Sequence, residues 1–598
     1  MSVSTLSEWV LTYRQQPQQL VAAYQQLNAN LSRDDNAWIY IASHDEIHAQ
    51  LTTILHAINS GDKQVGDYPL LGVPFAVKDN IDVAGMPTSA ACPAFTWTPQ
   101  QDATVVARLK AAGAVVVGKT NLDQFATGLV GTRSPFGAVK NTFNPDYVSG
   151  GSSSGSASVV ARGLVCFSLG TDTAGSGRVP AGFNNIVGLK PTKGWLSNKG
   201  VLPACRLNDC VSIFALTVAD AQAVAEVAGG YDPQDPYSRH HPKTSPARFS
   251  ETPRFAIPDK LEFFADIHSE AAFAKTLARL EQQGAELVPI DFSAFTQLAE
   301  QLYYGAWVAE RTVAVGEFFR NQPEEMDPTV RGIVANGLNY TACDAWQAEY
   351  TRAELAQKIN AQLAGFDALV VPTSPTIHTI AEMAQEPVRF NSQFGTYTNF
   401  TNLADLCAQA LPGDFRDDGL PAGITLIAPA WHDRALSQFG MAWQAAINLP
   451  LGATDKLLPA PGAEKISSNH VRVAVVGAHL RGMPLNHQLT TRNAVFIKET
   501  RTAASYRLYA LANTQPAKPG LARNQEGQPI AVELWDIPQA CFGEFVAEIP
   551  APLGIGTLTL EDGESVKGFI CESIALADAT DITAWGGWKA WLARHHSA

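Results

Sequence analysis

Two serines and one lysine are the residues of this chain whose types and spacing could do chemistry. Ser152 lies in the run Gly-Gly-Ser-Ser-Ser-Gly-Ser-Ala at 150–157, and Ser176 lies in Gly-Thr-Asp-Thr-Ala-Gly-Ser-Gly-Arg at 170–178. Lys78 follows an apolar segment that predicts a buried strand. A serine hydroxyl attacks a carbonyl carbon only when a base takes its proton, and a lysine whose pKa is lowered by burial can be that base. These residues predict acyl transfer without a histidine.

The loop that carries Ser176 also offers a place for the oxyanion that acyl transfer creates. Thr173, Ala174, Gly175 and Ser176 supply consecutive backbone N–H groups with little side-chain bulk in the way. One preorganised donor of this kind is worth about 3–4 kcal/mol in the transition state. Ser152 could pass the proton from the nucleophile to the base. The sequence therefore predicts a nucleophile, a relay, a base and an oxyanion hole in one site.

Short apolar runs alternate with helical runs from 71 to 191, which predicts an α/β domain with a mixed sheet. A flexible linker is the alternative reading of 152–156, but the run lies inside this dense pattern. The run at 113–120 fits the P-loop pattern GxxxxGK[ST]. Its Ala-Val-Val-Val core is strand-like and a helical run precedes it, so we predict a strand there and a structural role for Lys119.

The pattern around Lys78 and the two serines resembles that of the amidase signature family. Further motifs follow in the family's order over roughly 65–455, including Gly-Lys-Thr-Asn-Leu-Asp-Gln-Phe, Pro-Thr-Lys-Gly and Gly-Leu-Pro-Ala-Gly-Ile. The resemblance implies an α/β fold whose mixed central sheet is flanked by helices. It also implies that Lys78 is the base, that Ser152 is the bridging serine after a cis peptide bond, and that Ser176 is the nucleophile.

Three features narrow the resemblance to the allophanate hydrolases within that family. They are the Ala-Gly-Ser triplet that ends at Ser176, the segment 121–133 and the segment 303–311. The resemblance implies that Tyr303 and Arg311 bind the substrate carboxylate, and arginine offers a planar fork that suits a carboxylate. On a continuous helix these two residues would lie about two turns and roughly 80° apart.

Gly128 and Gln124 are further candidate substrate contacts, through the backbone near Gly128 and the side chain of Gln124. The implied reaction is hydrolysis of allophanate, which is urea bearing a carboxylate, to ammonia and carbon dioxide. The implied associations are a link to urea carboxylase and a homodimer, and no cofactor is expected. A broad-specificity amidase, a catalytically dead scaffold and a glutamyl-tRNA amidotransferase A-type subunit remain as alternatives.

The length of 598 residues predicts two or more domains. We predict a helical leader at 1–65, an amidase domain at 66–454, a linker at 455–470 and a β-rich domain at 471–598. The opening of the last domain resembles γ-glutamyl cyclotransferase-like small β-barrels. In allophanate hydrolases this domain is assigned help with a later decarboxylation, and His487 is its candidate residue. A role in packing or oligomer assembly is the equal alternative.

Composition excludes several other classes of function. A net charge of −14 argues against a nucleic-acid surface. No apolar run reaches the roughly 18 residues of a membrane span, and the N-terminus does not resemble a secretory signal. His44 and His48 lie four positions apart without further ligands nearby, so no metal site is predicted. Eight cysteines without CxxC spacing suggest free thiols in the cytoplasm.

Overall fold

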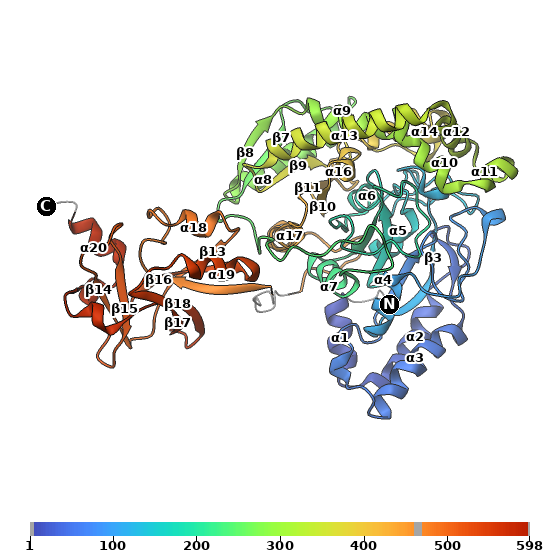
Figure 1. The fold of residues 1–598 in the computed structure, drawn as a ribbon. Coiled ribbons are helices and arrows are strands. Elements are labelled where there is room, and N and C mark those ends of the chain that lie inside the picture. The colour runs from blue at the N-terminus through green and yellow to red at the C-terminus, as the bar shows by residue number, and fades with distance from the viewer. Residues whose placement is uncertain (1–4, 460–468, 596–598) are drawn as a thin grey trace. The chain divides into compact units, whose positions relative to one another are not determined.

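The structure is a computed structural model that describes residues 5–459 and 469–595. It divides into two compact units (Figure 1). The first unit comprises Met1–His241 with Pro253–Pro459, and the second comprises Pro242–Thr252 with Ala460–Ala598. The short segment Pro242–Thr252 therefore groups with the C-terminal unit, although its place in the sequence predicted that it belongs to the amidase domain. Within the second unit, the Asn493 side chain donates to the Thr244 carbonyl oxygen at 3.0 Å.

An eleven-stranded mixed sheet forms the centre of the first unit, in the order β1-β3-β2-β4-β6-β5-β10-β11-β9-β7-β8. Strand β2 runs parallel to β3 and β4, and β7 runs parallel to β8 and β9, whereas the other neighbours are antiparallel. The mixed sheet predicted from the sequence is thus confirmed. The strands are β1 Trp38–Ile41, β2 Pro74–Lys78, β3 Val115–Thr120, β4 Phe167–Asp172, β5 Val187–Lys190, β6 Cys210–Ala215, β7 Arg254–Pro258, β8 Glu286–Ile290, β9 Ala368–Pro372, β10 Leu406–Pro412 and β11 Gly423–Pro429.

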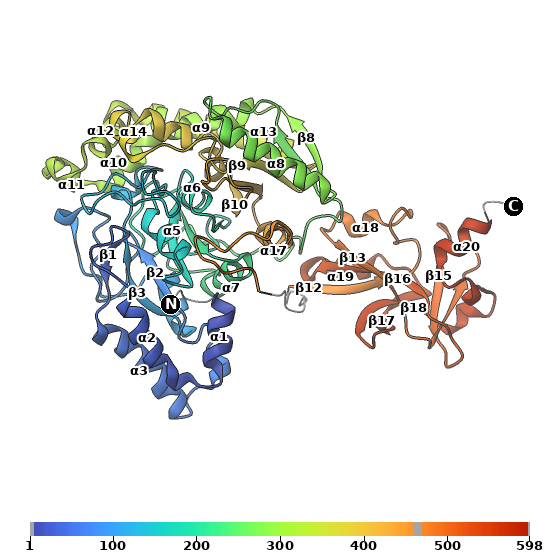
Figure 2. The ribbon, with the colours of Figure 1, turned by 180° about the vertical axis from the view of Figure 1, so that it is seen from behind.

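Helices gather at both ends of this sheet. The N-terminal helices α1–α3 lie near β1–β3, and the long helices α9 and α13 lie near β7–β9 (Figures 1 and 2). Capping boxes at Ser43 and Thr341 fix the starts of α3 and α13 by satisfying backbone N–H groups of the first turn. The helices are α1 Leu6–Arg14, α2 Leu20–Ala29, α3 His44–Asn59, α4 Thr104–Ala111, α5 Ser154–Ala161, α6 Val179–Phe183, α7 Val218–Ala228, α8 Ile267–Gln282, α9 Ser293–Tyr304, α10 Ala309–Val315, α11 Glu317–Asn321, α12 Pro328–Asn336, α13 Ala342–Leu363, α14 Ile380–Gln385, α15 Arg389–Phe394, α16 Phe400–Leu403 and α17 Asp433–Ile447.

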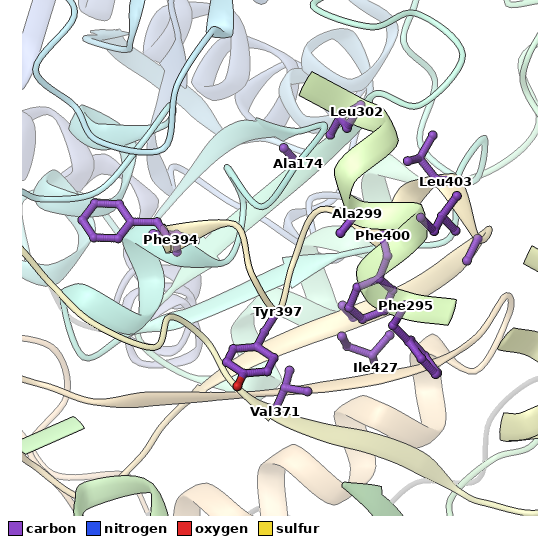
Figure 3. Packing of buried hydrophobic residues seen from close by; sticks show 14 of the residues in the cluster. Ala174, Phe295, Ala299, Leu302, Val371, Phe394, Tyr397, Phe400, Leu403 and Ile427 are labelled. Carbon is purple, nitrogen blue, oxygen red and sulfur yellow. The ribbon is translucent and has the colours of Figure 1, made fainter. Parts of the chain in front are cut away.

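One hydrophobic cluster joins α9 to the sheet and to the Ser176 loop (Figure 3). Phe295 on α9 meets Phe400 on α16 edge to face, with ring centroids 5.1 Å apart. Val371 of β9 and Ala174 of the loop belong to the same buried cluster. Because close-packed interiors resist displacement, this cluster holds the loop at a fixed place relative to the sheet.

The second unit is β-rich, as predicted. A five-stranded mixed sheet has the order β13-β16-β12-β18-β17, and a three-stranded sheet has the order β15-β14-β19. The antiparallel pair β17 and β18 forms a hairpin around the turn sequence Glu-Asp-Gly-Glu at 561–564. The elements are β12 His470–Val475, α18 His487–Thr490, β13 Val495–Arg501, β14 Tyr506–Ala510, β15 Pro519–Arg523, β16 Ala531–Pro538, α19 Gln539–Ala547, β17 Leu553–Thr559, β18 Ser565–Cys571, β19 Thr580–Asp581 and α20 Trp588–His595. Most of the predicted linker, 460–468, lies outside the described residues.

The P-loop-like run forms strand β3, so the strand prediction is confirmed. The Lys119 ammonium pairs with the Asp79 carboxylate at 3.1 Å, and both side chains are buried. Lys119 therefore ties β3 to the chain that follows β2. Within the described ranges, no helix is both long enough and apolar enough to cross a membrane.

Candidate active site

Lys78 ends strand β2, the third strand from the β1 edge of the large sheet, and is completely buried. Its ammonium nitrogen lies 2.8 Å from Ser152 Oγ and 2.7 Å from Thr171 Oγ1. Thr171 belongs to β4, which pairs with β2 in parallel. The sheet thus brings the lysine to Thr171, a contact that the sequence did not predict, and the loop before α5 brings Ser152 to the same nitrogen.

Burial lowers the pKa of Lys78 to about 7 because the charged form loses its water. Asp123, Asp209 and Asp172 oppose this shift, and Arg311 adds to it. A substantial fraction of Lys78 is consequently neutral near pH 7, which is the form that can accept a proton.

Ser152 follows a cis peptide bond with Gly151 and lies just before α5. A Cβ atom on Gly151 would lie 2.1 Å from Asp123 Oδ2, so only glycine fits there. The Asp123 carboxylate accepts N–H groups from Val130, Gly131 and Arg133, and the Asp123 N–H donates to the Ser152 carbonyl oxygen at 3.1 Å. Asp123 therefore fastens the serine loop to the loop 128–133.

Ser176 is almost completely buried, and its hydroxyl donates to the Gly128 carbonyl oxygen over a long 3.4 Å. Asp172 and Arg178 flank it and form a fully buried ion pair at 2.9 Å, which links the two sides of the Ser176 loop. The Ser176 hydroxyl does not bond to Ser152 here, and catalytic hydrogen bonds are often loose before substrate binds.

The backbone N–H groups of the loop 173–176 are candidate hydrogen-bond donors for an oxyanion. Within the described residues, none of its four backbone N–H groups has a hydrogen-bond partner. Gly175 has a φ of +142°, and a Cβ atom there would lie 2.5 Å from Thr398 Oγ1. The Thr173 hydroxyl donates to Asp209, whose pKa burial raises to about 6. The sequence did not predict a role for Asp209, since nothing in the local pattern links it to Thr173.

Tyr303 and Arg311 come together, although not on one helix. Helix α9 ends at Tyr304, and Arg311 lies on α10 after a break at Gly305. The Arg311 guanidinium nevertheless donates to the Tyr303 hydroxyl at 3.1 Å and lies 4.9 Å from the ring centroid. It also donates to Thr127 Oγ1 at 2.9 Å. The break allows two residues from different turns to meet.

Gln124 is held by the protein at both ends of its amide. Its Nε2 donates to the Ala91 carbonyl oxygen at 3.0 Å, and its Oε1 accepts the Asp327 N–H at 2.7 Å. The side chain therefore has its main hydrogen-bonding groups occupied within the fold. Gly128, in contrast, reaches Ser176 through its carbonyl oxygen.

The C-terminal unit contains a cavity of about 220 Å³ that His487 does not line. His487 is exposed on α18, with Nδ1 2.9 Å from the Pro484 carbonyl oxygen. His479 lines the cavity instead, together with Lys518. Its Nε2 lies 2.7 Å from Gln488 Oε1, and burial lowers the pKa of its imidazole. In the described parts of the chain, no three His, Cys, Asp or Glu side chains gather as metal ligands do.

Comparison with known protein families agrees with this geometry. The family described as Amidase matches residues 19–436, and the family described as Allophanate hydrolase C-terminal domain matches residues 471–593. The chain belongs to the amidase family. This amidase is similar to the allophanate hydrolase of Kluyveromyces lactis, with 43% identity and a TM-score of 0.86 over 99% of this chain and 100% of that one. The predicted resemblance to allophanate hydrolases is thus confirmed over nearly the whole chain.

This amidase is also similar to two other kinds of protein. It is 45% identical to the urea amidolyase of Saccharomyces cerevisiae over 94% of its own length, but it covers only 31% of that relative. The chain therefore spans about a third of the length of the urea amidolyases it matches. It is 35% identical to the A-type subunit of the glutamyl-tRNA(Gln) amidotransferase of Symbiobacterium thermophilum, over 64% of this chain and 84% of that one.

Proposed function

We propose that this amidase hydrolyses allophanate to ammonia and carbon dioxide in urea degradation. The observation that carries the proposal is the position of Arg311, a buried cation held by Tyr303 and Thr127 and without an ion-pair carboxylate in the described structure. Thr127 directly precedes Gly128, which touches Ser176. A planar guanidinium at this place suits a substrate that carries a carboxylate beside its amide.

In this proposal Ser176 attacks the terminal amide carbon while Ser152 relays its proton to neutral Lys78. The free N–H groups of 173–176 hold the oxyanion, and the protonated relay then gives a proton to the leaving ammonia. The 2.8 Å contact between Lys78 and Ser152 supports the relay. Water hydrolyses the acyl-enzyme to N-carboxycarbamate, which ends as carbon dioxide and a second ammonia.

Ammonia release from purified protein tests this function. The substrates are allophanate, urea, malonamide and a neutral aliphatic amide, at equal concentrations. We expect rapid release from allophanate alone, because only allophanate places an anion on Arg311. Comparable release from the neutral amides would keep the serine–serine–lysine site but make the protein a broad-specificity amidase.

The role of a glutamyl-tRNA amidotransferase A-type subunit is the second candidate, since such proteins match the amidase part of the chain. Two observations disfavour it. The net charge of −14 does not favour a tRNA surface, and the C-terminal family match is to allophanate hydrolases. Release of ammonia from glutamine, but not from allophanate, would reverse this preference.

Arg311→Met should separate anionic from neutral substrates. We expect kcat/KM for allophanate to fall about 100-fold, mainly through KM, because a buried charge partner is lost. Malonamide hydrolysis should change little. Tyr303→Phe removes only the hydroxyl that orients the guanidinium and should give a smaller loss in the same direction. Equal losses on allophanate and malonamide would contradict the assigned roles.

We also propose that the C-terminal unit promotes the breakdown of N-carboxycarbamate and has the γ-glutamyl cyclotransferase-like barrel fold. The five-stranded sheet and the cavity beside it support this reading. His487 is the residue that the sequence suggests, but its exposure disfavours it. His479, which lines the cavity near Lys518, is the better candidate for a proton transfer.

Alanine substitutions at the two histidines distinguish them. We expect His479→Ala to slow carbon dioxide release about tenfold or more relative to the first ammonia, because a general acid or base is lost. His487→Ala should leave this ratio unchanged. The measurement is stopped-flow carbon dioxide detection beside ammonia release. Unchanged ratios in both variants would leave the C-terminal unit with a role in packing or assembly.

The remaining associations are proposals of the same kind. A functional link to urea carboxylase is supported by the similarity to the much longer urea amidolyases. A cytoplasmic location is supported by the eight cysteines, none of which forms a disulfide in the described structure.

A homodimer is supported by an apolar groove of about 310 Å³ on the amidase unit. It is lined by Leu207, Trp307, Val313 and Trp346, and the last two side chains are well exposed. Exposed apolar patches of this kind mark interaction surfaces. Light scattering should give twice the chain mass, and Trp346→Glu should shift it toward the monomer. A monomeric wild type would contradict the dimer.

A further inference from the structure

Arg133 is a second buried guanidinium beside the candidate active site. Its side chain is only 3% exposed. One terminal nitrogen donates to the Thr127 carbonyl oxygen at 2.9 Å and the other to the Pro387 carbonyl oxygen at 2.7 Å. The inner nitrogen, Nε, has no hydrogen-bond partner among the described residues. Arginine is almost never buried so completely without a paired charge.

No carboxylate forms an ion pair with this guanidinium in the part of the chain that the structure describes. Asp123 and Asp327 are the carboxylates near enough to favour its charged form, and Tyr303 acts in the same direction. Asp123 already accepts three backbone N–H groups, including that of Arg133 itself. Asp327 accepts the first N–H groups of α12. Both carboxylates are thus committed to the backbone.

Thr127 joins Arg133 to Arg311. Arg133 donates to its carbonyl oxygen, and Arg311 donates to its hydroxyl at 2.9 Å. The two like charges repel each other across Thr127. Burial lowers the pKa of Arg133, and the charge of Arg311 lowers it further. Burying two positive charges next to one residue, away from water, costs free energy unless an anion binds beside them.

We propose that Arg133 is a specificity-determining residue that strengthens the carboxylate subsite with a second positive charge and holds Thr127 in place for Arg311. It acts through its charge and through Thr127, without touching the substrate. The inference rests on the proposed hydrolysis of allophanate. A neutral donor could have bonded the same two carbonyl oxygens without a buried charge.

The proposed reaction gives a reason for a second positive charge near the substrate. Allophanate carries one negative charge, and attack by Ser176 adds a second on the oxyanion. Hydrolysis of the acyl-enzyme gives N-carboxycarbamate, which has two carboxylates. Positive charge fixed in advance stabilises the stages with two negative charges more than the stage with one. The loss of Arg133 should therefore lower kcat as well as raise KM.

The test compares wild type, Arg133→Met and Arg133→Lys on allophanate and on malonamide. We expect Arg133→Met to lower kcat/KM for allophanate about 10- to 100-fold and to leave malonamide within about threefold. Arg133→Lys keeps the charge and should recover most of the preference for allophanate. Arg108→Met is the matched control, because Arg108 also donates to backbone carbonyl oxygens but lies on α4 and reaches the chain at the end of α7. Its substrate preference should equal that of the wild type.

Inhibition by malonate, a stable dicarboxylate, keeps the test decisive if Arg133→Met does not fold. In that case inhibition by malonate and inhibition by malonamide are compared for Arg133→Lys and for Arg133→Gln. Only the Arg133→Gln protein should lose the preference for malonate, which carries two negative charges. If the Arg133 variants lost as much activity or affinity with neutral ligands as with charged ones, Arg133 would have only a structural role and the inference would be overturned. A wild type without preference for allophanate would instead defeat the proposed function. A wild-type preference that survives in Arg133→Met or Arg133→Gln would defeat only this inference.

Discussion

Ser176→Ala should reduce ammonia release from allophanate by about 10⁴- to 10⁶-fold, because the nucleophile of the proposed acyl-enzyme is removed. The fold should survive, since within the described residues the hydroxyl makes a single long hydrogen bond, to the Gly128 carbonyl oxygen. The measurement is steady-state ammonia release together with a thermal melt. Labelling by a serine-directed fluorophosphonate should also disappear.

Ser158→Ala is the matched control for this substitution. Ser158 is also a buried serine, on α5, and its hydroxyl touches none of the candidate catalytic groups in the described structure. Its turnover and labelling should match those of the wild type. Normal turnover by a folded Ser176→Ala protein would end the proposed mechanism, and a wild type that takes no label would support a dead scaffold.

Lys78→Met should lower kcat by about 10²- to 10⁴-fold, the usual contribution of a general base. The wild type should also show an acid limb in kcat/KM. Because burial lowers the pKa of Lys78 to about 7, the base is protonated below that pH and neutral above it. Activity should therefore rise about tenfold per pH unit up to about pH 7 and then level off.

The residual activity of Lys78→Met should lack this acid limb, since the titrating group is gone. Lys110→Met is the control, because Lys110 is a half-exposed lysine on α4 that pairs with Asp102 away from the site. It should keep both the rate and the pH profile. An acid limb that persists unchanged in Lys78→Met would show that another group titrates, and Asp209, whose pKa is raised to about 6, would be examined next.

Local patterns in the sequence sufficed for several parts of the fold. The strand at Lys119 and the hairpin of β17 and β18 follow from apolar runs bounded by turn residues. The ion pair of Asp172 and Arg178 joins two residues on either side of Ser176, only six positions apart. Such features depend on residues that are close in the chain, so a single sequence carries their signal.

Contacts between distant segments were harder to predict. A continuous helix would have carried both Tyr303 and Arg311, yet they meet across a break at Gly305. The bonds of Gln124 to Ala91 and Asp327 connect segments more than 30 and 200 positions apart. No local pattern shows whether a polar side chain will be occupied by such partners.

The sequence by itself determined which chemical groups this protein has: two serines, a lysine, a loop of small residues and an arginine suited to a carboxylate. It did so because the type of each residue and its spacing from its neighbours are properties of the chain itself. Only the tertiary structure decided which of these groups meet and in what environment. Lys78 becomes a candidate base because the sheet buries it against Ser152 and Thr171. Arg133 becomes a candidate specificity residue because folding buries it beside Arg311, with no paired carboxylate among the described residues. Burial and charge pairing are properties of the whole fold.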